Sequence, residues 1–104
     1  MPKVKLAEKK IEKFNTLKVQ AGTNCPQGGD YGHGGRTVLR LCDESSTAME
    51  VKINDGPLMD AKCIEIVLGG DSECDTFIEA LEFALETLRA QRTSNAITAE
   101  LVIR

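Results

Sequence analysis

The sequence has few aromatic residues and no tryptophan. Three phenylalanines and one tyrosine are its only aromatic side chains among 104 residues. A protein that stacks bases on aromatic rings is expected to carry more of them. The formal net charge of -3 gives the whole chain no attraction to a phosphate backbone. We therefore expect no direct binding to nucleic acid.

Long apolar runs are also missing. No stretch is long enough to cross a membrane, and the first residues lack the apolar segment of a secretory signal. The cysteines are widely spaced and form no CxxC pair. Reduced thiols are the default in a chain without a signal peptide. We therefore expect a cytoplasmic protein, with no membrane contact, whose four cysteines are all free: Cys25, Cys42, Cys63 and Cys74.

Hydrophobic periodicity indicates the fold class. Short apolar or alternating segments predict strands at 16–21, 37–42, 49–53 and 63–68, and more weakly at 97–103. Apolar residues at helical spacing predict a helix that begins at Asp71 or Ser72 and breaks at 93–95. Its apolar stripe comprises Phe77, Ile78, Leu81, Ala84, Leu85 and Leu88.

These elements predict an α+β fold. We expect a single domain over residues 1–104, in which an antiparallel sheet of four to five strands packs against one long amphipathic helix. Residues 1–13 are expected to form a basic N-terminal arm or a short helix. The apolar stripe of the helix is expected to be buried against side chains of the sheet, namely Leu39, Leu41, Val51 and Ile66.

The loop over residues 22–35 is rich in glycine and long for so small a domain. It holds six of the nine glycines, which let the backbone approach a ligand. Successive backbone N–H groups there can form an anion-binding nest. An ordered turn without a binding role is an equal alternative. The candidate ligand- or partner-binding residues of this loop are Asn24, Asp30, His33 and Arg36.

Metal and catalytic sites are weakly indicated. Cys25 and His33 are the candidate zinc ligands, but their spacing fits no standard zinc signature. The same two side chains form a poor nucleophile pair, because no oxyanion donor can be named beyond the loop amides. We therefore expect no metal, no cofactor and no enzymatic activity.

Charge is concentrated in the first half of the expected helix. Residues 71–86 include six acidic side chains and no basic one. Four of them are spaced by four, three and four residues, so they line one side of a helix. This acidic face, which comprises Asp75, Glu79, Glu82 and Glu86, is either a solvated surface or a surface that binds a basic partner.

Three segments resemble a group of small phage and prophage proteins. They are AGTNCPQGGDYGHGGRT at 21–37, IEIVLGGDSE at 64–73 and TFIEALEFALE at 76–86. The group carries a GGDxGHGxRT loop after its first strand and an IxLGGDxE step into one acidic helix. Its members are similar to counter-defence proteins, in particular type II anti-CRISPR inhibitors, which are non-enzymatic and act by binding the CRISPR nuclease.

The resemblance implies a phage-encoded inhibitor that binds a bacterial defence effector, with a type II CRISPR nuclease as the expected partner. The alternative is a protein that sequesters a signalling nucleotide of an antiphage system. That activity would use the loop amides, Arg36, and Arg89 and Arg92 at the interface of a possible homodimer. A structural or regulatory phage domain is the third possibility.

Overall fold

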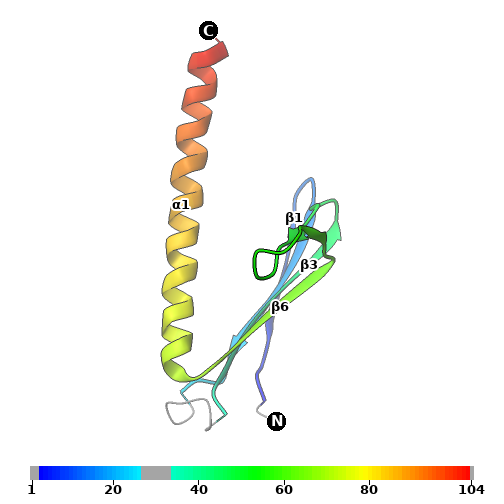
Figure 1. The fold of residues 1–104 in the computed structure, drawn as a ribbon, viewed down its shortest axis with the longest axis vertical. Coiled ribbons are helices and arrows are strands. Elements are labelled where there is room, and N and C mark those ends of the chain that lie inside the picture. Colours follow the sequence, from blue (N-terminus) through cyan, green and yellow to red (C-terminus); the bar gives the residue numbers. More distant parts are fainter. Residues whose placement is uncertain (1–2, 27–33, 104) are drawn as a thin grey trace. The chain divides into compact units, whose positions relative to one another are not determined.

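The computed structural model describes residues 3–26 and 34–103, with side chains described as far as residue 96. The chain forms two compact units, Met1–Cys74 and Asp75–Arg104. The first unit contains all the strands, and the second contains most of a single long helix (Figure 1). The secondary structure confirms the α+β class.

The main sheet has four antiparallel strands in the order β1-β2-β3-β6. Three of them coincide with the strands predicted at 16–21, 37–42 and 63–68, and each is longer than predicted by at least one residue. The four strands are β1 (Ala7–Glu12), β2 (Thr16–Thr23), β3 (Arg36–Ser45) and β6 (Cys63–Gly69).

Strand β1 corrects the expectation of an arm or short helix at residues 1–13. Its sequence, AEKKIE, does not alternate cleanly, but it pairs with β2 along its whole length, with Lys9 opposite Val19 and Ile11 opposite Leu17. The backbone of β2 therefore determines the conformation of β1. Lysines are suited to an edge strand, because they discourage further pairing with other chains.

The apolar face of the sheet is built from cross-strand pairs. Leu41 of the central strand β3 stands between Val19 of β2 and Ile64 of β6. Leu39 faces Ile66 on the same side of the sheet. Because side chains alternate along each strand, the intervening residues lie on the opposite face.

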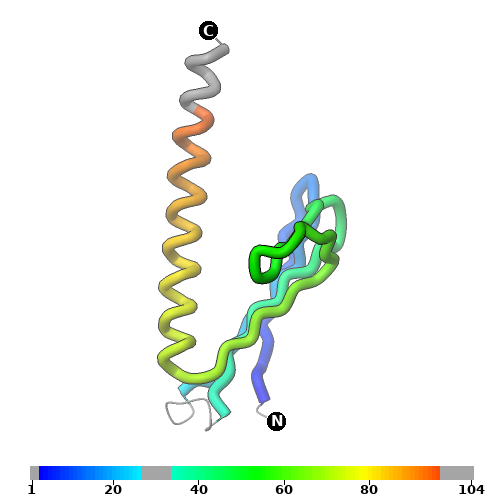
Figure 2. Tube along the Cα trace, viewed as in Figure 1, coloured from blue at the N-terminus to red at the C-terminus, as the bar shows by residue number. Residues whose placement is uncertain are grey.

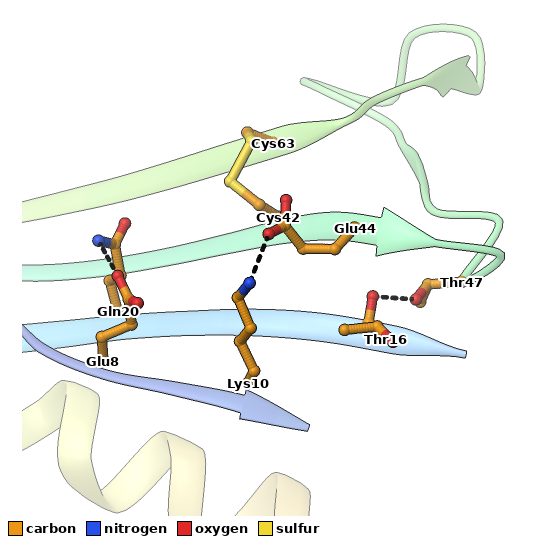
Figure 3. Close-up of polar contacts among 8 residues, drawn as sticks. All are labelled: Glu8, Lys10, Thr16, Gln20, Cys42, Glu44, Thr47 and Cys63. Carbon is orange, nitrogen blue, oxygen red and sulfur yellow. Dashed lines mark hydrogen bonds and ion pairs between the residues drawn. A yellow bond between two sulfur atoms is a disulfide. The ribbon is translucent and has the colours of Figure 1, made fainter. Parts of the chain in front are cut away.

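That opposite face is mostly polar, and Figure 3 shows some of its side chains. Gln20 Nε2 donates a hydrogen bond to Glu8 Oε1 at 2.9 Å, and Lys10 Nζ lies 3.6 Å from Glu44 Oε1. Such exposed pairs add at most about 1 kcal/mol each, since water screens them.

A disulfide joins Cys42 to Cys63 across β3 and β6 (Figure 3). The prediction of four free thiols is therefore wrong for these two residues. They are direct cross-strand neighbours with Cα atoms 4.1 Å apart, somewhat closer than the usual separation of about 4.5 Å in a non-hydrogen-bonded antiparallel pair. Cys42 is the most buried side chain described, with an exposed fraction of 2%.

The strand predicted at 49–53 is shorter and lies in a different sheet. Strand β4 (Glu50–Val51) pairs only with β5 (Met59–Asp60), so they form a separate two-stranded sheet. Asn54 and Asp55, between the two strands, both have positive φ angles, which are typical of Asn and Asp in a tight turn.

The helix α1 (Asp71–Ile103) begins where the sequence predicts, but it continues through residues 93–95 to Ile103 (Figure 1). The predicted break and the predicted strand at 97–103 are therefore wrong. Thr93 Oγ1 donates to the Arg89 carbonyl 3.1 Å away, one turn earlier, so its hydroxyl is bonded without interrupting the helix. No helix among the described residues has the length and apolar character needed to cross a membrane.

The helical unit Asp75–Arg104 does not cover its own apolar stripe. The exposed fractions are 43% for Leu81, 48% for Leu85 and 67% for Leu88, and only Phe77 is half-buried. Burial of these leucines against the sheet therefore stays a prediction. Helical spacing places apolar residues on one face, but it does not specify which surface covers that face.

Candidate functional site

The glycine-rich loop leaves and rejoins the sheet at one end. Strand β2 ends at Thr23 and β3 begins at Arg36, and Asn24 N donates to the Arg36 carbonyl at 3.1 Å. Beside this pair, Gly70 N donates to the Gly35 carbonyl at 3.0 Å. The loop termini and the junction between β6 and α1 are therefore held together by backbone hydrogen bonds, and Figure 2 shows the chain turning there from strand into helix.

Asn24 closes the loop with its side chain. Its Nδ2 donates to the Gly34 carbonyl at 3.2 Å, and its Oδ1 accepts from Arg36 N at 2.7 Å. One amide therefore bonds to a carbonyl and an N–H group on the returning segment. The half-buried Asn24, a predicted partner-binding residue, lies at the base of the loop, where it fixes the loop's two ends.

Arg36 is the first residue of β3 and is half-buried. Its Nη1 donates to the Gly35 carbonyl at 2.9 Å, so the guanidinium folds back against its own backbone. This contact orients a positive charge beside the loop. Arg36 and Asn24 are thus brought together, whereas Asp30 and His33 lie outside the described residues, and a binding role for the four residues stays a prediction.

Hydroxyl groups complete the base of the loop. Thr23 Oγ1 donates to the Arg36 carbonyl at 3.0 Å and accepts from Cys25 N at 3.1 Å. The buried Thr37 Oγ1 also lies 3.0 Å from Thr23 Oγ1. Sequence reasoning missed both threonines. Their position in the sequence could have identified them, because they flank the two ends of the loop, where backbone groups need side-chain partners.

The predicted zinc ligands receive no support from the described part of the chain. There, no three His, Cys, Asp or Glu side chains cluster closely enough to hold a metal ion. Cys25 Sγ lies 3.5 Å from the Gly70 carbonyl, which it contacts as a hydrogen-bond donor. The second candidate ligand, His33, lies outside the described residues, so the expectation of no metal stays a prediction.

The acidic face lies on the first four turns of α1. Its four carboxylates are all on exposed residues and, at about 100° per residue, fall within an arc of about 60°. They extend along about 16 Å of helix axis at the standard rise. Between Asp71 and Glu86 the sequence supplies no basic side chain to neutralise them. The structure therefore places the residues Asp75, Glu79, Glu82 and Glu86 on one negatively charged, solvent-exposed surface.

Comparison of the chain with protein-family models, with curated proteins and with solved structures gave no match.

Proposed function

We propose that this chain is a non-enzymatic binding protein that inhibits a bacterial defence effector, and that the effector is a type II CRISPR nuclease. The observation that carries the proposal is the exposed acidic face of α1. CRISPR nucleases hold nucleic acid in positively charged channels. A rigid, negatively charged helix surface is complementary to such a channel. The resemblance to type II anti-CRISPR inhibitors supplies the class of partner.

The spacing of the charges supports mimicry of a nucleic-acid strand. Four carboxylates occupy about 16 Å of helix axis. One strand of a DNA duplex presents about five phosphates over the same length. The acidic face therefore offers nearly the linear charge density that a nucleic-acid channel is built to accept.

The energetics of the isolated helix favour a binding role for this face. Like charges three and four residues apart destabilise a helix by a few tenths of a kcal/mol per pair. Lysine and arginine side chains of a channel would remove that repulsion on binding. Attraction between the two charged surfaces would also steer the encounter and raise the association rate.

The test is association kinetics against a purified type II CRISPR nuclease. The triple variant Glu79→Lys/Glu82→Lys/Glu86→Lys should associate at least about tenfold more slowly than wild type at about 0.05 M salt. The difference should largely disappear at about 0.5 M salt, because counterions screen exposed charges. Equal on-rates at both salt concentrations would contradict the proposal.

A matched control changes net charge by the same amount elsewhere. Glu12, Glu50 and Asp60 are exposed residues of the strands β1, β4 and β5. Replacing all three by lysine should slow association much less than the reversal of the acidic face. A similar loss in both variants would show that net charge, and not the acidic face, controls binding. Native mass spectrometry would reveal a bound nucleotide if the chain instead sequesters a signal.

A further inference from the structure

The two free cysteines, Cys25 and Cys74, meet at the base of the loop. Two oxygen atoms, Thr23 Oγ1 and the Gly70 carbonyl oxygen, each accept a hydrogen bond from the backbone of one cysteine and another from the thiol of the other cysteine. Thr23 Oγ1 accepts from Cys25 N at 3.1 Å and from the thiol of Cys74 at 3.7 Å. The Gly70 carbonyl accepts from Cys74 N at 3.2 Å and from the thiol of Cys25 at 3.5 Å. This reciprocal arrangement places each thiol close to the backbone of the other cysteine.

The Thr23 hydroxyl cannot satisfy all of its neighbours. A hydroxyl has one proton and two acceptor lone pairs. Its proton is directed to the Arg36 carbonyl, it accepts from Cys25 N at 3.1 Å, and Thr37 Oγ1 lies 3.0 Å away. The thiol of Cys74, at 3.7 Å, is the most distant donor and the weakest. Cys74 is therefore held loosely enough for its sulfur to rotate to another partner.

The two thiols differ in access. Cys74 is buried, with an exposed fraction of 6%, whereas Cys25 is half-buried at the edge of the loop. A small reagent therefore reaches Cys25 first. Cys74 is placed to react second, from inside the protein. This order of access is typical of a pair in which one cysteine is modified and its neighbour resolves the modification.

We propose that Cys25 and Cys74 form a second disulfide when the protein meets a small-molecule disulfide. The Cys25 thiolate attacks one sulfur of the reagent, forms a mixed disulfide and releases one small thiol. The Cys74 thiolate then attacks the Cys25 sulfur and releases the second small thiol. The two protons of the protein thiols end on the two released thiols. The new bond ties the end of β2 to the first turn of α1.

The experiment uses oxidised glutathione and alkylation before denaturation. After incubation, wild type should lose both alkylatable thiols, gain no lasting glutathione adduct and form no disulfide between two chains. Cys63 and Cys74 lie in one tryptic peptide, since Lys62 and Arg89 are the flanking cleavage sites. A second digestion after glutamate, at Glu65 and Glu73, separates them and should reveal a peptide that joins Cys25 to Cys74.

Two variants test the order of the steps. Cys74→Ser should accumulate glutathione on Cys25, because no resolving thiol is present. Cys25→Ser should leave Cys74 unmodified in the folded protein and reactive in urea. A wild-type protein that keeps glutathione on Cys25 while Cys74 stays free would overturn the proposal, as would a disulfide between two chains. The wild-type result does not depend on either variant folding.

Discussion

The Cys42–Cys63 disulfide gives the most quantitative prediction. It bridges a sequence separation of 21 residues, and it encloses the turn after β3 and the two short strands β4 and β5. Loop-closure entropy for a crosslink of this size amounts to about 3 kcal/mol. Reducing the bond should therefore lower the free energy of unfolding by about 3 kcal/mol. For a chain of this length that is a large part of a total of about 5–15 kcal/mol.

The assay is urea denaturation followed by circular dichroism, with and without a phosphine reductant. The variant Cys42→Ala/Cys63→Ala is the matched control, because it should be insensitive to the reductant. A reductant effect below about 1 kcal/mol in wild type would refute the reasoning, since the crosslink would then not restrict the unfolded chain. An equal effect in the control variant would assign the change to the reductant itself.

Substitutions at three further positions probe the first unit by urea denaturation. Gly22→Ala should cost about 1–3 kcal/mol, because its Cβ would collide with the Lys5 carbonyl oxygen; a neutral result would show that β2 and the N-terminal segment are farther apart. Asn24→Ala should cost about 1–3 kcal/mol, because it leaves Arg36 N and the Gly34 carbonyl without their side-chain partner. Asn24→Asp keeps the acceptor and should cost less, so equal losses would contradict this role. Arg40→Ala should change stability by less than about 1 kcal/mol, since its 3.5 Å ion pair with Glu65 is exposed; a larger loss would mean that the pair is shielded from water.

Hydrophobic periodicity predicted those strands and helices whose conformation is determined by their own side chains. Strand β2 alternates apolar and polar residues, and α1 begins at Asp71 with two acidic residues in its first turn, so both starts were predictable. Strand β1 was not, because AEKKIE has no alternating pattern and becomes a strand through pairing with β2. The end of α1 was missed because Thr93, Ser94 and Asn95 are weak helix formers that the surrounding helix tolerates.

The disulfide was predictable in part. Cys42 closes one predicted strand and Cys63 opens another, so antiparallel pairing of these strands would place the two residues opposite each other. Spacing alone does not give that pairing, and the expectation of a cytoplasmic protein favoured free thiols. The disulfide argues against a permanently reducing environment, and the cytoplasmic location stays a prediction.

The sequence predicted where the candidate site lies better than it predicted what each of its residues contacts. The loop composition identified Asn24 and Arg36, but not that Asn24 uses both ends of its amide to close the loop. Those hydrogen bonds form only because the fold brings Gly34 and Arg36 back beside Asn24, and the sequence alone does not give that contact. The acidic face could be predicted from the sequence alone. The spacing of residues along a helix determines which of them share a face, whatever the helix contacts.

Inhibition of DNA cleavage tests the central claim most directly. A guide-loaded type II CRISPR nuclease would be incubated with excess wild type, with the reversal Glu79→Lys/Glu82→Lys/Glu86→Lys, or with the control reversal at Glu12, Glu50 and Asp60. Target DNA would then be added and the cleavage rate measured. The account predicts that wild type and the control reversal suppress cleavage and that the reversal of the acidic face does not. Unchanged cleavage in the presence of wild type, or equal suppression by all three proteins, would contradict it.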